Sequence, residues 1–375
     1  MPEAPRPLAG ITVIEIAQNL AGPYAGEILA RLGADVIKIE RPEGGDDARG
    51  WGPPFLDGAG AGFHAVNAGK RSVALDLRDP HAVDRLRARL ARADVLLQNL
   101  RAGALEALGL GASAVCALNP RLIYCSVSAF GATGPLRDRP GYEPMIQAFT
   151  GLMLTGGDEG DPPGRIGVPI VDYGTGMWAV IGVLAGLRQR EQTGRGCVVD
   201  AALFETALGW LGNHVAHFRV SGEVQARHPT ASARLVPFQA FETKTGPLIV
   251  AAGNDRLFTA FARALDRPDW AGDPRYRTNA GRFEHRAALV KEIAVIMQTR
   301  TKGEWLDRLE QAGVPCAPVQ TLVEALAHPQ TAASGIIQPV PGAGLEVVGL
   351  PLRLDGARPA VPGRAPSLGE HDAEL

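Results

Sequence analysis

Asp172 is the residue in this chain whose surroundings best suit covalent chemistry. It follows the apolar run from Val168 to Val171 and precedes Tyr173-Gly174-Thr175-Gly176 and a long apolar helical pattern. A carboxylate at the end of a strand or loop that faces a helix N-terminus is favoured as an anion by backbone N–H groups and the helix dipole. The position therefore suits an ionised nucleophile. The same pattern is typical of a helix N-cap or an Asx-turn, and the local sequence leaves both interpretations open.

Alternating strand and helix patterns surround Asp172. An apolar strand at 11–16, a helix at 23–32 and a strand at 35–39 predict an opening β-α-β unit. The pattern continues with helices near 80–91, 105, 177–190 and 203–220 and strands at 95–97, 122–127 and 197–200. This alternation predicts an α/β fold, with a mostly parallel sheet covered on both faces and ligands at the carboxyl ends of the strands. The first turn, Gln18 to Pro23, lacks G-x-G-x-x-G, which argues against a standard dinucleotide site.

The pattern changes after residue 220. Residues 221–232 are polar and predict a linker, followed by a hairpin around 244–246 and helices near 256–265, 285–298 and 302–311. Thr301 and Glu304 have the spacing of a capping box for the last helix. We therefore expect a large domain over 1–220, completed by an irregular segment at 330–375 that wraps back over it, and a small α+β domain over 225–325.

Composition excludes several function classes. The 375 residues are 46% hydrophobic and 21% charged, as in a soluble globular protein, and no apolar run long enough to span a membrane is evident. The net charge of −2 gives no general attraction to nucleic acid or to an anionic membrane, so neither is expected as a partner. The four cysteines form no C-x-x-C pair, which favours reduced thiols and a cytoplasmic location. The eight histidines show no metal-ligand spacing, and no metal is expected.

Several short segments, taken in order, resemble the family III CoA-transferases, the group that includes formyl-CoA, carnitine and succinyl-CoA-dependent transferases. Each is weak alone, but their order and spacing are specific and cover nearly the whole chain. The segments are Asn19 to Pro23, Leu32 to Pro42, Lys70 to Ser72, Asn119 to Tyr124, Gly131-x-x-Gly134-Pro135, Pro140-Gly141-Tyr142, Asp172 to Gly176, and Thr193 to Gly196. The resemblance implies a Rossmann-like large domain, a smaller α+β domain and an interlocked homodimer.

The same resemblance implies a chemistry for Asp172. This carboxylate would attack a donor acyl-CoA to give a mixed anhydride and then an aspartyl-CoA thioester, from which an acceptor acid takes the CoA. Carboxylate anhydrides and thioesters are both reactive acyl carriers, so a carboxylate fits this role. Coenzyme A and acyl-CoA are then substrates, and no cofactor is permanently bound. Glu143 is a second catalytic candidate that would position the acyl group; a simple helix N-terminal acid is the equal alternative.

The resemblance also implies where CoA binds. It places along the CoA site Asn19, Leu20, Ala21, Arg41, Leu75, Arg78, Asn99 and Leu100. A local basic set could contact the phosphates, because arginine and lysine form charge-assisted hydrogen bonds with them: Lys38, Arg41, Lys70, Arg71 and Arg78. For Lys38 and Arg71, a solvated surface charge is the even alternative. Leu20 stands where formyl-CoA transferase has a glutamine, and Ala107 replaces a basic residue of the family.

Substrate class depends on a few further positions. Racemases of the superfamily carry His-Asp where this chain has Tyr142-Glu143, and without that histidine a two-base proton exchange lacks a partner. Residues 46–55, 236–241 and 252–255 resemble the branch that uses succinyl-CoA with glutarate or hydroxymethylglutarate. Arg49 and Tyr142 are the substrate-contacting candidates. Arg49 could hold the distal carboxylate of a dicarboxylate, or form an ion pair with Asp46 or Asp47.

The sequence therefore predicts an enzyme that transfers CoA from an acyl-CoA, most simply succinyl-CoA, to a small carboxylic acid, most simply a dicarboxylate. Two alternatives stay open. One is a 2-methylacyl-CoA racemase or epimerase, and the other is a protein that binds CoA esters without transferase turnover.

Overall fold

The computed structural model describes residues 6–374, which form two compact units. Unit 1 comprises the described residues up to Leu152, Arg165–Gly212, and the residues from Pro329 onward. Unit 2 comprises Met153–Gly164 and Asn213–His328. The catalytic candidates Glu143 and Asp172 both belong to unit 1.

Unit 1 is built on a six-stranded sheet in the order β5-β2-β1-β6-β7-β8, in which every pair of neighbours is parallel. The strands are β1 Thr12–Ile16, β2 Asp35–Glu40, β5 Arg71–Ala74, β6 Val95–Gln98, β7 Ile123–Ser128 and β8 Val198–Ala202. The predicted α/β fold with a mostly parallel sheet is confirmed. Strand order reverses between β1 and β6, and in open α/β sheets ligands bind in the crevice at such a switch point.

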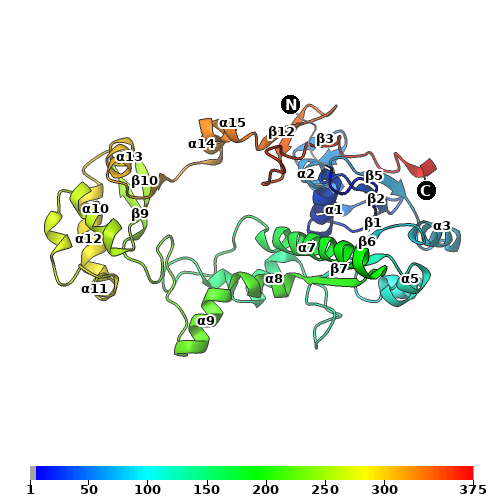
Figure 1. Ribbon diagram of the computed structural model, residues 1–375, viewed down its shortest axis with the longest axis horizontal. Coiled ribbons are helices and arrows are strands. Elements are labelled where there is room, and N and C mark those ends of the chain that lie inside the picture. Colours follow the sequence, from blue (N-terminus) through cyan, green and yellow to red (C-terminus); the bar gives the residue numbers. More distant parts are fainter. Residues whose placement is uncertain (1–5, 375) are drawn as a thin grey trace. The chain divides into compact units, whose positions relative to one another are not determined.

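Helices cover both faces of this sheet. Neighbouring strand residues such as Val13 and Ile14 are buried in different hydrophobic cores, which explains why the strands are continuous apolar runs. One core lies under α1 and α7, which run side by side (Figure 1), and the other lies under α3. The helices of unit 1 up to α8 are α1 Ala21–Arg31, α2 Ala61–Asn67, α3 Pro80–Leu90, α4 Ala104–Ala107, α5 Ala112–Leu118, α6 Glu143–Phe149, α7 Ile170–Thr193 and α8 Leu203–Trp210.

Two helix predictions were wrong in their bounds. Helix α7 begins at Ile170 rather than at 177, so the apolar residues before Asp172 form its first turn and no strand. The helix predicted over 203–220 is two helices, α8 and α9 Gly212–Ser221, which break at Leu211. Helix α7 is also long and apolar enough to cross a membrane, although no such run was expected. Half of its most apolar window is buried, and a core helix passes the same test, so this is weak evidence for a membrane span.

Unit 2 contains the antiparallel sheet β11-β10-β9 and a helical core. The strands are β9 Phe238–Thr243, β10 Gly246–Ala251 and β11 Cys316–Pro318, and the helices are α10 Asp255–Ala264, α11 Asn279–Glu284, α12 Arg286–Met297, α13 Lys302–Gln311 and α14 Leu322–Ala327. The predicted hairpin between β9 and β10 is confirmed. The capping box is confirmed as well, since Thr301 and Glu304 each bond the other's backbone N–H. Trp270 and Trp305 are among the largest side chains of the buried core.

The C-terminal segment returns to unit 1 and packs along its edge strand β5. It contains α15 Pro329–Ser334 and the hairpin of β12 Ile337–Val340 and β13 Leu345–Val348. A separate small hairpin of unit 1, formed by β3 Phe55–Leu56 and β4 Ala59–Gly60, follows β2 in the sequence. The N–H of His371 donates to the carbonyl of Ser72 at 2.9 Å, and the N–H of Ala74 donates to Asp372 at 2.7 Å. The tail therefore covers backbone groups that an edge strand would leave unpaired.

Candidate functional site

Asp172 lies in the first turn of α7, at its third residue. The N-cap position is Pro169 and carries no side-chain cap, so Asp172 is neither the N-cap nor an Asx-turn residue. The helix precedes β8 in a parallel sheet and runs antiparallel to the strands, which places its N-terminus at their carboxyl ends. The capping interpretation of Asp172 is therefore wrong, and the side chain is free for another role.

Gly176, one turn after Asp172, explains how α7 fits against its neighbour α1. A Cβ atom on Gly176 would lie 2.7 Å from the carbonyl oxygen of Ala21, so only glycine allows α7 to approach the first turn of α1 this closely. The rings of Tyr173 and Tyr24 meet edge to face beside this contact, with centroids 4.7 Å apart. Glycine costs helix stability, and this approach offsets the cost. The start of α7 is thereby fixed against the start of α1.

Glu143 and Arg165 complete the charged surroundings of Asp172. Glu143 is the first residue of α6 and is buried, and the guanidinium of Arg165 lies 3.3 Å from its Oε2. Gln147, one turn along α6, donates to the other oxygen of Glu143. The same amide also accepts from the N–H of Ile166 at 3.0 Å and donates to its carbonyl at 3.2 Å. Gln147 thus ties α6 to the segment that leads into α7.

The carboxyl group of Asp172 is hard to ionise. Burial is the largest cause that raises its pKa, the carboxylate of Glu143 adds to the rise, and Arg165 partly opposes both, which together give a pKa of about 7. The expectation that the helix start keeps this carboxylate fully ionised is wrong, because desolvation and a like charge outweigh the helix dipole here. A pKa near neutrality is instead typical of carboxylates at functional sites.

Five of the predicted CoA-site residues lie at the switch point between β1 and β6. Asn19, Leu20 and Ala21 follow β1, and Asn99 and Leu100 follow β6. Asn99 donates to the carbonyl of Gln18 and accepts from its N–H, both at 2.8 Å, so it joins the two strand ends. The N–H groups at the start of α1 have no side-chain cap from Leu20, and such open N–H groups suit an anionic ligand.

The Asn19 loop is held in a strained backbone by a buried charge. Asn19 has φ 69°, in the left-handed region, and its N–H donates to Asp46 Oδ1 at 3.0 Å. The other oxygen of Asp46 lies 2.9 Å from Nζ of Lys38, which also pairs with Glu15 at 2.9 Å. Asp46 is therefore a positioning residue for this loop that the sequence analysis missed.

The remaining predicted CoA contacts differ in accessibility. Arg41 and Arg78 are exposed and paired with neighbouring carboxylates, Arg41 with Asp47 and Arg78 with Asp76 at 2.8 Å. Leu75 is buried, and its backbone N–H donates to the carbonyl of Glu40 at 2.7 Å. Its side chain belongs to the core under α3.

The basic set expected for the CoA phosphates is mostly engaged elsewhere. Lys38 and Lys70 are fully buried, and both pair with Glu15, Lys70 at 2.7 Å. Burial lowers the pKa of Lys70 to about 8 even though the carboxylate of Glu15 opposes the change. Arg71 pairs with Asp35 and Glu374 at the surface. The prediction that Lys38 and Lys70 contact phosphates is wrong, since neither ammonium group reaches the surface.

The two residues predicted to contact the substrate, Arg49 and Tyr142, have different surroundings. Arg49 forms a bidentate pair with Glu40, at 2.7 and 2.8 Å, and its guanidinium lies 4.0 Å from the ring centre of Phe63. It is therefore neither paired with Asp46 or Asp47, as one prediction had it, nor free to hold a substrate carboxylate. Tyr142 is the N-cap of α6, directly before Glu143, and its side chain is 63% exposed.

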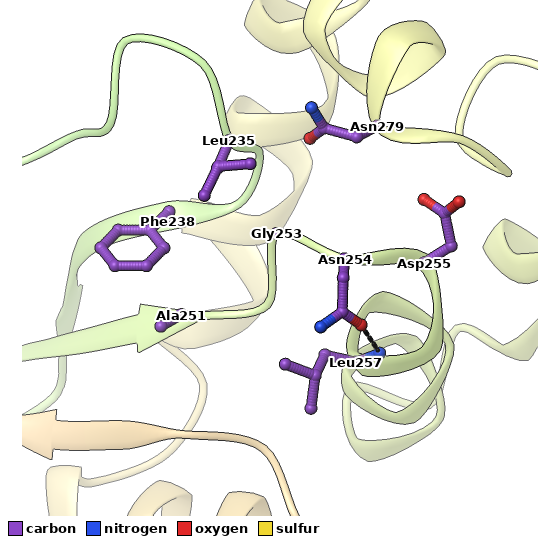
Figure 2. A pocket seen from close by; sticks show the side chains of 8 residues that line it. All are labelled: Leu235, Phe238, Ala251, Gly253, Asn254, Asp255, Leu257 and Asn279. Atoms are coloured by element: carbon purple, nitrogen blue, oxygen red, sulfur yellow. Dashed lines mark hydrogen bonds between the residues drawn. The ribbon is translucent and has the colours of Figure 1, made fainter. Parts of the chain in front are cut away.

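A pocket of about 430 Å³ lies entirely within unit 2 and is shown in Figure 2. Its walls include Leu235, Phe238, Leu257, Asn254, Asp255 and Asn279. The polar groups are used within the unit: Asn254 caps α10, and Asp255 pairs with buried Arg282 at 2.9 Å. No cluster of three potential metal ligands occurs within residues 6–374.

Comparison with known proteins places these features in context. Residues 8–372 match the profile of CoA-transferase family III. Succinyl-CoA:glutarate CoA-transferase of Homo sapiens is 35% identical over 99% of this chain and 85% of its own length. Succinate–glutarate CoA-transferase of Agrobacterium fabrum is 36% identical over 100% of this chain and 96% of its own.

Solved structures agree with the sequence matches. A CaiB/BaiF family protein from Brucella suis is 38% identical, with a TM-score of 0.88 over 99% of this chain and 98% of its own. A hypothetical protein from Mycobacterium tuberculosis is 30% identical, with a TM-score of 0.89 over 99% of each chain.

Proposed function

This chain belongs to CoA-transferase family III, and from that premise we propose that it transfers CoA from succinyl-CoA to a dicarboxylic acid through covalent intermediates on Asp172. The family and the named relatives establish it as an enzyme that moves CoA between acyl-CoA thioesters and carboxylic acids. The observation that carries the mechanism is the partly buried carboxyl group of Asp172, with a pKa of about 7, fixed beside Glu143 and the uncapped start of α1.

The proposed reaction exchanges bonds at three carbonyl carbons, those of the donor, of Asp172 and of the acceptor, without net proton transfer. The Asp172 carboxylate attacks the donor thioester carbonyl, the C–S bond breaks, and a mixed anhydride and CoA thiolate form. The thiolate attacks the Asp172 carbonyl, the C–O bond breaks, and the donor acid leaves as its carboxylate. The acceptor carboxylate then attacks the aspartyl-CoA thioester and releases the thiolate. Attack of that thiolate on the acceptor acyl carbon gives the new acyl-CoA and regenerates Asp172.

The surroundings assign roles to the other predicted residues. We place CoA at the switch point, against Asn19, Leu20, Ala21, Asn99 and Leu100. These residues share a position at the carboxyl ends of β1 and β6, where ligands of open α/β sheets bind, and this supports the placement. The uncapped N–H groups at the start of α1 are candidate donors to the tetrahedral oxyanion, in place of the side chain that Leu20 lacks. The exposed Arg41 and Arg78 bind phosphate groups of CoA when these replace their present partners, Asp47 and Asp76.

The relatives support a dicarboxylate acceptor. Besides the two glutarate enzymes, similar proteins carry the names succinyl-CoA–D-citramalate CoA-transferase, 33% identical, and succinyl-CoA:mesaconate CoA-transferase, 34% identical. Each of these four names contains succinyl-CoA or succinate and a second acid with two carboxyl groups. Exposed Tyr142 is the proposed contact to the acyl chain. The absence of a histidine at this position removes the second base that a racemase needs.

A homodimer is the proposed assembly. One face of α7 is apolar and exposed, at helical spacing: Met177, Trp178, Ile181 and Leu184. A contiguous apolar face of this kind suits burial against a second copy of the chain. Trp178→Glu should shift the protein toward monomer in light scattering, and an unchanged mass would contradict the assignment. The free cysteines support the proposed cytoplasmic location.

The deciding experiment incubates the protein with succinyl-CoA and a panel of mono- and dicarboxylates, and compares the wild type with Asp172→Ala. We expect CoA transfer by the wild type only, with dicarboxylates preferred, and a hydroxylamine-sensitive adduct on Asp172. Transfer by Asp172→Ala at the wild-type rate would refute the mechanism. Failure of the wild type to form any adduct would favour a CoA-ester-binding protein. Deuterium uptake at the acyl α-carbon would favour the racemase.

A further inference from the structure

Arg165 is an arginine beside the nucleophile with most of its donors unused. Its side chain is 47% exposed, and its single ion pair within the described part of the chain is the 3.3 Å contact with Glu143. A guanidinium has five N–H donors, and two parallel ones fit a carboxylate. The other arginines near the crevice differ, because Arg41, Arg49 and Arg78 each already hold a carboxylate at shorter range.

Arg165 is held where it is by its neighbours. Gln147 fixes the backbone of the next residue, Ile166, through both its N–H and its carbonyl. Glu143 is buried and receives the guanidinium on one oxygen and the amide of Gln147 on the other. Side chains with fixed partners bind with less loss of entropy, so this guanidinium is pre-organised for a ligand. Arg165 also opposes the rise in the pKa of Asp172, as expected for two opposite charges on neighbouring segments.

We propose that Arg165 binds the reacting carboxylate of the free acid substrate, beside Asp172 and on the guanidinium edge that Glu143 leaves open. This inference rests on the proposed transferase function and names the anion subsite of that site. It concerns the donor acid as it leaves and the acceptor acid as it enters, since both are carboxylates in front of an acylated Asp172.

Charge balance supports this assignment. In the free enzyme, ionised Asp172, Glu143 and Arg165 together carry a charge of −1. When Asp172 is an aspartyl-CoA thioester, it is neutral, and only the Glu143–Arg165 pair is left. Binding of the acid substrate as a carboxylate then returns the net charge of the site to −1, because the acid carries the negative charge that Asp172 has lost. Above pH 7 the ionised Asp172 of the free enzyme repels the acid, so the acid binds after the CoA transfer to Asp172.

This order makes the acid a substrate of the intermediate and a weak ligand of the resting enzyme. A thioester carbonyl is neutral and gains little from a guanidinium, so Arg165 should matter far more for the acid than for the acyl-CoA. The expected signature is therefore a change in KM for the acid without a matching change in KM for succinyl-CoA.

The test compares Arg165→Gln and Arg165→Lys with the wild type in glutarate-dependent CoA transfer at pH 8.5, which lies above the pKa of about 7 of Asp172 in the wild type. We expect KM for glutarate to rise roughly tenfold or more in Arg165→Gln, as for the loss of a charge-assisted hydrogen-bond pair, with partial recovery in Arg165→Lys. KM for succinyl-CoA should stay within about twofold, as expected for a residue that does not bind the thioester.

Arg92→Gln is the matched control. Arg92 is exposed and precedes β6, so it lies at the amino end of the sheet, opposite to Asp172, and this variant should keep the wild-type constants. Formation of the hydroxylamine-sensitive Asp172 adduct from succinyl-CoA by Arg165→Gln shows that the variant is folded.

Two results would overturn the inference while leaving the proposed function intact. One is an unchanged KM for glutarate in an adduct-forming Arg165→Gln. The other is an equal rise in KM for succinyl-CoA, which would place Arg165 on the distal carboxylate of the donor. Absence of the adduct in the wild type would instead refute the proposed function itself.

Discussion

Replacing Asp172 by asparagine should inactivate the enzyme and at the same time stabilise the fold at neutral and alkaline pH. The side chains have the same shape, and asparagine cannot ionise or act as a carboxylate nucleophile. The pKa of about 7, against an ordinary value of 3.8, corresponds to roughly 4 kcal/mol in favour of the neutral carboxyl group. Because Asp172 is partly exposed, water screens the charge, and this figure is an upper value.

The raised pKa of Asp172 also fixes how the stability gain of Asp172→Asn changes with pH. A carboxyl group whose pKa is raised in the folded state stabilises the fold fully below its unfolded-state pKa. That contribution is lost as the pH rises through the folded-state pKa of about 7. Relative to the wild type, Asp172→Asn should therefore gain at most roughly 2 kcal/mol at pH 5 and roughly 4 kcal/mol at pH 8.

Urea unfolding at pH 5, 6, 7 and 8, at one fixed protein concentration, measures this difference. Asp138→Asn is the control, since Asp138 is exposed and its ion pair among residues 6–374 is with its neighbour Arg137, and its effect should stay within about 0.5 kcal/mol at every pH. The reasoning is refuted if the advantage of Asp172→Asn over the wild type does not grow between pH 5 and pH 8.

Three further predictions follow from the same geometry. The kcat/KM for succinyl-CoA should rise with pH through about 7, as Asp172 ionises. Glu143→Gln should move this rise in kcat/KM to lower pH, because it removes the like charge that raises the pKa of Asp172. A pH–rate profile from pH 5 to 9 checks both. Lys38→Met should lower the free energy of unfolding in urea by about 3–5 kcal/mol, since buried Asp46 loses its cation and buried Glu15 is left with Lys70 alone; a loss below 1 kcal/mol would contradict it. Gly176→Ala should push α7 away from α1 and raise KM for succinyl-CoA, whereas Gly209→Ala, with open space around its Cβ, should leave that KM unchanged.

The strands and most helices of the large unit could be predicted because their apolar runs are long and well punctuated. Strands β1, β2, β6, β7 and β8 were all identified. The short β5 was not, because its four residues include Arg71 and Ser72 and show no apolar run. The break between α8 and α9 was also missed, since their sequence continues one apolar pattern across it.

At the site, residue types were easier to predict than their partners. Asp172 and Glu143 could be singled out from the sequence, whereas Gln147, within α6, and Arg165, in a segment rich in glycine and proline, carried no signal. Lys38, Lys70 and Arg49 were misassigned for one physical reason. A basic residue in the sequence does not reveal whether a buried carboxylate lies within 3 Å of it.

The sequence by itself determined the parallel α/β fold and the family and singled out Asp172 as the candidate catalytic carboxylate, since periodicity and ordered motifs are local properties of the chain. Only the tertiary structure decided the ionisation of Asp172 and the partners of each cation. The pKa of about 7 arises from burial and from Glu143, 29 positions earlier in the chain, and both depend on the packing of α6 and α7. Charge interactions act through space, and neither composition nor spacing records the distances that set them.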